Sequence, residues 1–395
     1  MSEGRHRLLL LINSLEGGGA EKVMAYLAGE LAKTLNGVDI RLALLDDLPA
    51  AYAVDSAVEV VRLDSRGSLL RSISQTRRQI AAWQPDVVLS FLTRANCAAI
   101  LARRKGHFRC VISERVNTSS HFGNQFRGRL FRRIVSRLYP RADKIVAVSE
   151  GVRDEMLANY QVPAARLSVI HNPFDIARLR TEGARKPTIA LPDDFFVTAG
   201  RLVPNKGHEV LLHAFARHRN RDRALLVLGE GAERPALETL ARDLGIADRV
   251  QLPGYVENPH AIISRATAYV SASRSEGFPN ALVEAMALGC AVAATDCPSG
   301  PAEILAERPA GMTDGLETAA WGLLVPMDDA AGLSTAMDYY DDPGNRQRYA
   351  KRAGQRSAAF APAPVVAAYA QALGSQLDGR HGEGAGSLLQ KNVAR

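Results

Sequence analysis

The sequence lacks any apolar run long enough to cross a bilayer, which takes about 20 consecutive apolar residues in a helix. The basic segment 1–7 is followed by the apolar run 8–12, which is too short for the hydrophobic part of a secretion signal. We therefore expect a cytoplasmic protein without a transmembrane anchor. Any contact with the membrane would then be peripheral, on the inner face of the cell membrane.

Cysteine is also scarce, since Cys97, Cys110, Cys290 and Cys297 are the only four in the chain. They lie in apolar or loop segments without the spacing of metal ligands, so we expect buried thiols. No Asp-x-Asp sequence occurs, and neither a chelated divalent metal nor a cofactor is indicated. The dinucleotide-binding glycine pattern is missing too, because Lys22 stands where a third glycine or alanine is expected.

Acidic residues are under-represented in the first half of the chain. Residues 1–180 hold 27 Lys and Arg against 17 Asp and Glu, whereas residues 181–395 hold 22 against 25. The net charge of the whole chain is +7, so the first half carries all of the positive excess. A basic half suits an anionic partner such as nucleic acid, anionic lipid or an anionic substrate.

What the chain does contain is a repeated alternation of apolar runs and helical patterns. Its 395 residues, 47% of them apolar, are enough for about two domains. The alternation predicts an α/β fold with a parallel sheet in each domain. We place the first domain at 1–178, a linker around 176–192, the second domain at 190–357, a C-terminal helix at 358–378 and a disordered tail at 379–395. First-domain strands are predicted at 8–12, 40–45, 58–63, 87–91, 110–113 and 144–149, and second-domain strands at 195–199, 224–228, 250–252, 268–271 and 291–295.

Glu276 and Glu284 stand out in the second domain. A loop leads there into a predicted helix that begins after Pro279 and stops at Gly289. Between residues 281 and 288 every side chain except Glu284 is apolar, which predicts a buried helix. No Lys or Arg lies between residues 276 and 296, so a buried Glu284 would need a partner from elsewhere in the chain or from a ligand. The alternative is that Glu276 stabilises the helix start and Glu284 faces solvent.

Two cations follow the first predicted strand of the second domain. That strand delivers Gly200, Arg201 and Lys206 into a loop. Arg offers a planar fork of donors and Lys a mobile charge, so the pair suits a diphosphate. An ordinary solvated basic loop is the alternative.

The segment from Phe122 to Arg141 is the most basic in the chain. Apolar residues recur in it at helical spacing, with arginines between them. This pattern favours a helix that lies on an anionic membrane surface or guides a lipid-linked acceptor. An amphipathic helix with one face in the core is the alternative. Nucleic-acid binding is disfavoured, because no recognised motif supports it.

Glu276 and Glu284 are separated by seven residues, with Gly-Phe-Pro-Asn after the first. This pattern resembles the Glu-x7-Glu motif of retaining glycosyltransferases of family 4, which have the GT-B fold. Segments 16–22 and 200–207 are also similar to motifs of that family, and the motifs follow its order along nearly the whole chain. Segments 90–96 and 113–117 resemble those of bacterial members that build surface polysaccharides. The resemblance implies two Rossmann-like domains facing across a cleft, with the C-terminal helix crossing back onto the first.

The resemblance also implies roles for individual residues. Arg201 and Lys206 would neutralise the leaving diphosphate, Glu276 would contact the donor sugar, and Glu284 the ribose of the nucleotide. We therefore expect Glu276, Arg201 and Lys206 to be catalytic. The expected donor-binding residues are Glu284, Gly200, Phe278, Pro279, Asn280, Tyr255, Val256, Gly18 and Gly19. The expected acceptor-side residues are Arg94, Asn96, Arg115 and His121.

The function implied is retaining transfer of a sugar, a hexosyl group, from a nucleotide-diphosphate sugar, UDP being the commoner nucleotide. The acceptor would be a glycan or a polyprenyl-diphosphate-linked glycan in cell-surface polysaccharide or lipopolysaccharide biosynthesis, without a metal. The alternatives are a nucleotide-sugar epimerase or phosphorylase on the same fold, and a non-catalytic, membrane-associated protein that binds nucleotide sugars. We also expect Glu284 to be poorly paired in a structure without donor.

Overall fold

The structure is a computed structural model that describes residues 5–103, 108–116 and 126–378. Its chain forms two compact units, one from residues 1–173 with 363–395 and the other from residues 174–362. The expected linker is not extended, because residues 176–192 begin with helix α7 (Ile176–Ala184), which packs against α10 (His260–Ile263) and α11 (Asn280–Ala287) of the second unit. The tail at 379–395 lies outside the described residues.

The first unit is built on a seven-stranded sheet in the order β3-β2-β1-β4-β5-β6-β7. Every pairing between these strands is parallel. The run from Leu8 to Ile12 in the central strand is fully buried, as a strand covered on both faces should be. The strands are β1 (His6–Ile12), β2 (Val38–Leu44), β3 (Glu59–Arg62), β4 (Val87–Phe91), β5 (Arg109–Glu114), β6 (Lys144–Ala147) and β7 (Leu167–Val169).

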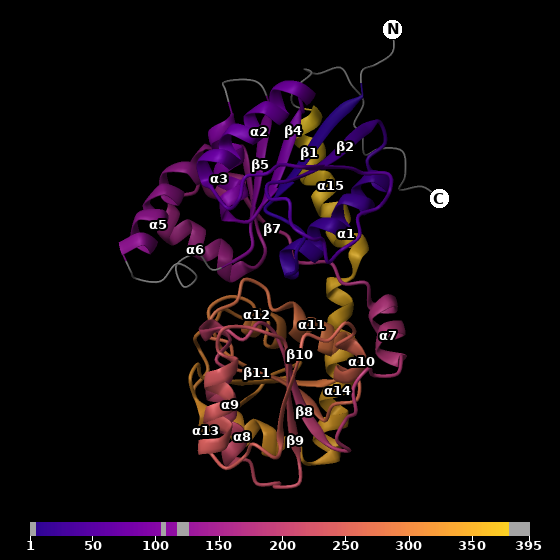
Figure 1. Ribbon diagram of the computed structural model, residues 1–395, viewed down its shortest axis with the longest axis vertical. Helices are drawn as coiled ribbons and strands as arrows, with labels where there is room; N and C mark the ends of the chain where they lie inside the picture. The colour runs from indigo at the N-terminus through magenta and orange to yellow at the C-terminus, as the bar shows by residue number, and fades with distance from the viewer. Residues whose placement is uncertain (1–4, 104–107, 117–125, 379–395) are drawn as a thin grey trace. The chain divides into compact units, whose positions relative to one another are not determined.

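The last helix of the chain, α15 (Pro362–Asp378), packs on this first sheet (Figure 1). Val366, Tyr369 and Leu373 of α15 are buried in the same apolar core as Leu8 and Leu10 of β1. The predicted return of the C-terminal helix to the first unit is therefore confirmed. The other helices of this unit are α1 (Gly19–Thr34), α2 (Leu69–Trp83), α3 (Thr93–Ala102), α5 (Phe126–Leu138) and α6 (Glu150–Tyr160), with 3-10 turns η1 (Tyr139–Arg141) and η2 (Ala164–Arg166).

The second unit repeats the design, with sheet order β10-β9-β8-β11-β12-β14-β13. All of its pairings are parallel except that of β13 with β14. Strand β13 has only two residues, too few for a sequence pattern to predict. The strands are β8 (Phe195–Ala199), β9 (Ala224–Leu228), β10 (Val250–Gly254), β11 (Ala268–Ser271), β12 (Ala291–Thr295), β13 (Glu317–Thr318) and β14 (Leu323–Val325).

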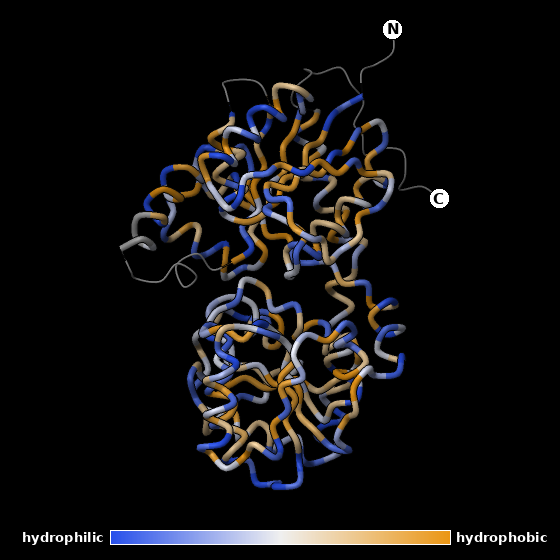
Figure 2. The backbone as a smooth tube through the Cα atoms, viewed as in Figure 1, coloured by the Kyte–Doolittle hydropathy of each residue, from blue (hydrophilic) through white to orange (hydrophobic). Residues whose placement is uncertain are grey.

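Helices cover this second sheet, and apolar residues gather in the strands of both units while the outer loops are largely hydrophilic (Figure 2). Helix α11 follows Pro279 and ends before Gly289, which has the positive φ of 73° that suits glycine. The other helices are α8 (His208–Arg217), α9 (Arg234–Asp243), α12 (Pro301–Leu305), α13 (Ala330–Tyr339) and α14 (Pro343–Ser357), with 3-10 turns η3 (Pro204–Lys206) and η4 (Ala358–Phe360).

The sequence has few cysteines and no long apolar run, and the structure bears on both features. All four cysteines are buried and free, as predicted, and burial raises the pKa of the Cys97, Cys110 and Cys290 thiols to about 12. In the described part of the chain, no helix combines the length and apolarity needed to span a membrane.

Candidate active site

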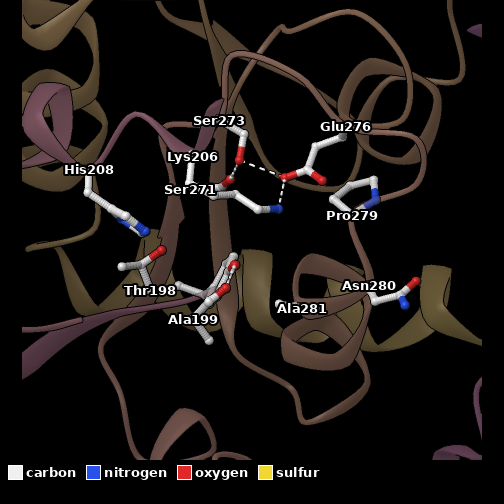
Figure 3. A pocket seen from close by; sticks show the side chains of 11 residues that line it. Thr198, Ala199, Lys206, His208, Ser271, Ser273, Glu276, Pro279, Asn280 and Ala281 are labelled. Atoms are coloured by element: carbon white, nitrogen blue, oxygen red, sulfur yellow. Dashed lines mark hydrogen bonds and ion pairs between the residues drawn. The ribbon is translucent and has the colours of Figure 1, made fainter. Parts of the chain in front are cut away.

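Two loops of the second unit meet at the carboxyl ends of neighbouring strands. Strand β8 leads into the loop that carries Arg201 and Lys206, and β11 leads into the loop that carries Glu276. Because β8 and β11 pair in parallel, both loops leave the sheet at the same edge. Lys206 Nζ lies 2.7 Å from Glu276 Oε1, so two of the three predicted catalytic residues are in direct contact (Figure 3).

Gly207 makes this approach possible. Its φ is 61°, and a Cβ added there would lie 2.1 Å from the carbonyl oxygen of Ala272, just after β11. Any larger residue would push the Lys206 loop away from the end of β11. The two loops are also joined directly, since the backbone N–H of Arg274 donates to the carbonyl of Asn205 at 2.8 Å.

Glu276 is held by a serine that the sequence reasoning did not identify. Ser273 Oγ donates to Glu276 Oε1 at 2.6 Å, and Ser271 Oγ lies 3.2 Å from Ser273 Oγ. The Ser273 carbonyl in turn accepts from Thr295 Oγ1 at the end of β12. The available signal was the spacing of three residues between Ser273 and Glu276 in one loop, which lets the two side chains meet.

These side chains line a small polar pocket, shown in Figure 3. Its volume of about 30 Å³ admits a few atoms rather than a whole nucleotide sugar. A donor would therefore place one group here and lie mostly outside this pocket. The lining residues are Thr198, Ala199, Lys206, His208, Tyr269, Ser271, Ser273, Glu276, Pro279, Asn280 and Ala281.

His208 is the second pocket residue that the sequence reasoning missed. Burial and the neighbouring charge of Lys206 lower the pKa of His208 to about 4, so its imidazole is neutral at pH 7. His208 Nε2 lies 3.3 Å from the carbonyl oxygen of Arg201, which assigns the proton to Nε2. Nδ1 is buried and has no hydrogen-bonding partner among the described residues. The ring thus adds an acceptor beside Lys206 without adding charge.

Helix α11 presents the second carboxylate of the motif. Asn280, its first residue, lines the pocket, and Glu284 follows four residues later on the same helix face. The expectation that Glu284 would be poorly paired is wrong. His260 Nε2 of α10 lies 3.4 Å from Glu284 Oε2, and His260 Nδ1 lies 2.9 Å from Glu182 Oε2 of α7. The sequence pattern could not indicate this pairing, because residues far apart in the chain supply the partners.

The remaining predicted donor residues differ in exposure. Arg201 is exposed beside half-buried Gly200, and the Tyr255 side chain is 78% exposed at the end of β10, next to buried Val256. Phe278 instead packs against the rings of Phe174 and Phe360, with centroid distances of 6.3 and 5.4 Å. The Phe278 ring thus has a packing role, and its contact with the donor stays a prediction, whereas Pro279 lines the pocket.

In the first unit, Gly18 and Gly19 lie at the start of α1, where Gly18 is the residue before the helix. Arg94 is largely buried and forms an ion pair with Asp46, and it lies 3.4 Å from Asn13 Oδ1. Contact of Gly18, Gly19 and Arg94 with substrates stays a prediction. His121 lies outside the described residues.

Asn96 and Arg115 lie in the interior of the first unit. Asn96 is fully buried, and its amide bonds Ser90, the Ser113 carbonyl and Tyr139. Arg115 is also buried and donates to three side chains within the first unit. These bonds give both side chains a part in the packing of this unit, and their contact with an acceptor stays a prediction. The partners of Arg115 are Ser113, Asn172 and Tyr369.

Glu114 lies in the same buried network, at the end of β5. Its carboxylate accepts from the Tyr139 hydroxyl and, at 3.0 Å, from the backbone N–H of Arg115. Burial nevertheless raises the pKa of Glu114 to about 7, because the desolvation cost outweighs these bonds. The end of β5 in the first unit thus holds a buried polar cluster.

One group of described residues has the composition of a metal site: His218, Asp338 and Asp341. The guanidinium of Arg223, however, contacts Asp341 and also Asp194. Arg219 Nε lies 3.3 Å from Asp338 Oδ2, so each of the two carboxylates that a metal ion would need already has an arginine partner. The group is an ion-pair network at the end of α8, away from the candidate pocket, whose lining includes none of its members.

Two consecutive parts of the chain match known protein families. Residues 17–178 match the family described as Glycosyltransferase Family 4, and residues 193–340 match the family described as Glycosyl transferases group 1. The second match includes both loops of the pocket. The chain belongs to the family 4 glycosyltransferases.

Relatives of this family 4 chain span nearly its whole length. It is 28% identical over 368 residues, 90% of this chain and 95% of the relative, to the N-acetylgalactosamine-N,N'-diacetylbacillosaminyl-diphospho-undecaprenol 4-alpha-N-acetylgalactosaminyltransferase of Campylobacter jejuni. It is 25% identical to the lipopolysaccharide core biosynthesis glycosyltransferase LpsE of Rhizobium meliloti, covering 91% of this chain and 96% of LpsE.

Solved structures agree with the fold. HepE from Anabaena, in complex with UDP and glucose, is 19% identical with a TM-score of 0.70, over 94% of this chain and 100% of HepE. The apo form of the lipopolysaccharide outer core galactosyltransferase WaaB is 20% identical with a TM-score of 0.68, over 94% of this chain and 99% of WaaB. These similarities establish the fold, which is GT-B.

Proposed function

We propose that this family 4 glycosyltransferase moves a hexosyl group from a UDP-sugar, with retention of configuration. The acceptor is a glycan or a polyprenyl-diphosphate-linked glycan of cell-surface polysaccharide or lipopolysaccharide biosynthesis. The observation that carries the proposal is the contact between Lys206 and Glu276 in a polar pocket at the strand ends, with Arg201 exposed on the same loop.

Lys206 and Arg201 are suited to the negative charge that develops on a leaving diphosphate. Lys206 is paired with Glu276, so a diphosphate would compete with that carboxylate for the ammonium group. Placing fixed cations where charge develops in the transition state is usually the largest contribution that an enzyme of this kind makes. No metal is needed if these two side chains carry the task.

Glu276 is suited to bind hydroxyl groups of the donor sugar. Ser273 and Lys206 both donate to the same oxygen, Oε1, which leaves Oε2 as the acceptor for a sugar hydroxyl. Same-face attack, in which an oxygen of the leaving group takes the acceptor proton, removes the need for a separate general base.

The acceptor side of the proposal draws its support from relatives. The Campylobacter jejuni relative is named for a diphospho-undecaprenol-linked acceptor, and the Rhizobium meliloti relative for lipopolysaccharide core biosynthesis. We extend a lipid-linked or lipopolysaccharide acceptor to this chain on that basis. UDP as the nucleotide is supported by its presence in the similar HepE structure.

Peripheral contact with an anionic membrane through the segment from Phe122 to Arg141 belongs to the same proposal. Helix α5 contributes Arg133 and Arg137, which are exposed and four residues apart on one helix face, while Val135 is buried. Vesicles with and without anionic lipid would test this contact. Arg133→Gln with Arg137→Gln should weaken sedimentation with anionic vesicles, whereas Arg71→Gln with Arg78→Gln on α2 should not.

A donor-hydrolysis screen tests the catalytic proposal, because slow hydrolysis requires no acceptor. Purified protein is incubated with UDP- and GDP-sugars, with and without EDTA, and the released nucleotide is measured. We expect release from at least one UDP-sugar, unaffected by EDTA and abolished in Lys206→Ala. Inhibition by EDTA would contradict metal independence, and undiminished turnover in Lys206→Ala would contradict the site.

The same screen separates the alternatives. An epimerase would convert the nucleotide sugar without releasing UDP, and a phosphorylase would consume a sugar phosphate in the presence of free phosphate. A non-catalytic protein would bind UDP and release nothing from any donor, with any acceptor.

A further inference from the structure

His260 lies between two carboxylates that come from different helices. The side chain is 8% exposed, and its two ring nitrogens face Glu182 of α7 and Glu284 of α11 at 2.9 and 3.4 Å. Neither contact has the geometry of a hydrogen bond. The imidazole therefore packs between the Glu182 and Glu284 carboxylates and contacts both of them.

The two carboxylates are fixed from different directions. Arg178 Nε donates to Glu182 Oε1 at 2.8 Å, so Glu182 is held by α7 while its other oxygen faces His260. Glu284 Oε2 lies against the opposite ring nitrogen of the same imidazole. A change at His260 therefore acts directly on the Glu284 carboxylate.

The helices around His260 form a rigid support. Asn258 just before α10 donates to the Glu182 carbonyl at 2.9 Å, and Ser264 just after it donates to the Gly183 carbonyl at 2.8 Å. Arg180 of α7 donates to the Ala287 carbonyl at the end of α11 at 3.2 Å. These bonds join α10 to α7 and α7 to α11 around the imidazole.

We infer that His260 is a positioning residue for the nucleotide, because it holds the Glu284 carboxylate in the orientation that binds the ribose hydroxyls of the donor. The inference rests on the proposed function, which gives Glu284 the ribose. Asn280 connects it to the pocket, since Asn280 lines the pocket and lies one helical turn before Glu284 on α11. His260 itself touches no substrate. Glu182 in turn holds the imidazole from the far side.

The test compares nucleotides that differ only in the ribose hydroxyls. Calorimetry measures binding of UDP and of 2′,3′-dideoxy-UDP to the wild type, His260→Phe, Glu284→Gln and the double variant, with GDP and its dideoxy form in parallel. We expect His260→Phe to weaken UDP binding by about 5-fold, within the usual range of coupling between residues in contact. Binding of 2′,3′-dideoxy-UDP should stay within about 2-fold of wild type, because it lacks the groups that Glu284 would bind.

The double variant should bind UDP no more weakly than Glu284→Gln alone, because His260 acts only through that carboxylate. His260→Gln keeps a polar side chain that can contact Glu284, so it should give an intermediate loss of UDP affinity and serves if His260→Phe does not fold. Arg178→Gln is the matched control, since it removes the other partner of Glu182 and should leave UDP binding unchanged.

The outcomes separate this inference from the proposed function. Equal UDP affinity in wild type, His260→Phe and His260→Gln would overturn the positioning role, and so would an equal loss for UDP and 2′,3′-dideoxy-UDP, which indicates general damage. A wild-type protein that binds neither UDP nor GDP would overturn the proposed function, and the inference with it. A wild type that prefers UDP over its dideoxy form supports the function independently of His260.

Discussion

Both units carry polar residues at the carboxyl ends of their parallel strands. These residues are buried in the first unit and line a pocket in the second. In the first unit, Glu114 at the end of β5 is fully buried and bonded to its neighbours. In the second unit, Lys206 and Glu276 follow the ends of β8 and β11 and line a pocket. The carboxyl ends of parallel strands are where ligands usually bind. The cluster in the second unit lines a pocket with room for a ligand group.

The difference shows how burial separates polar residues that bind ligands from polar residues that hold a fold. Arg115 and Arg201 look alike in the sequence, since each follows a buried strand. The guanidinium of Arg115 donates hydrogen bonds to Ser113, Asn172 and Tyr369, whereas the side chain of Arg201 is exposed. A strand-end arginine indicates a binding site only when its donors remain available.

The largest expected effect is on the rate of donor hydrolysis, which should depend on the second-unit cluster of Lys206 and Glu276. Lys206→Ala or Glu276→Ala should lower donor hydrolysis by about 100-fold or more, because each removes a group placed against the reacting part of the donor. The partly exposed ion pair between them is worth only about 1 kcal/mol, so both variants should fold. Steady-state rates and urea unfolding measure the two effects. Lys351→Ala, at an exposed position on α14, is the matched control and should change neither.

A substitution in the buried cluster around Arg115 in the first unit should lower stability and leave nucleotide binding unchanged. Arg115→Met should lower the free energy of unfolding by about 3 kcal/mol, because it leaves buried polar groups without their charged partner. Arg115 also contacts the Phe91 ring, 4.2 Å from its centroid, so packing is lost as well. UDP affinity should be unchanged. An Arg115→Met protein with wild-type stability that fails only in transfer would support the acceptor role for this residue.

A pH titration of stability should reveal the buried carboxyl of Glu114. Its pKa is raised from the ordinary 4.5 to about 7 in the folded protein, so between these values the native state binds the extra proton. Stability therefore falls as the pH rises through this window, by about 3 to 4 kcal/mol in total.

The measurement for Glu114 is the difference in unfolding free energy between wild type and Glu114→Gln from pH 5 to pH 8. The wild type should lose stability relative to Glu114→Gln over that range. A difference that does not change with pH would show that Glu114 is not held in an unfavourable environment.

The smallest expected effect concerns Arg94, which forms a largely buried ion pair with Asp46 in the first unit. Arg94→Gln and Asp46→Asn should each cost about 1 kcal/mol of stability. If Arg94 contacts the acceptor, only Arg94→Gln lowers transfer several-fold while donor hydrolysis stays constant. Equal transfer by the two variants would assign Arg94 a structural role like that of Arg115.

The sequence by itself determined the architecture and the centre of the site. Buried strands such as 87–91 and 224–228 coincide with β4 and β9, because a short apolar run bounded by polar residues leaves little choice of structure. Helix α11 was predictable from local features, namely the proline before it and the glycine after it. The motifs also indicated that Lys206 and Glu276 belong to one site, whereas their direct contact came from the structure.

Only the tertiary structure decided which polar residues stay accessible and which partners they take. Arg115 bonds Tyr369, 254 residues away, and so becomes part of the contact that holds α15 on the first unit. Glu284 finds His260 and Glu182 on two other helices. Local patterns report whether a segment is apolar or polar, but burial and charge pairing depend on segments that meet only after folding. That is why the carboxylate expected to lack a partner lies instead against a histidine.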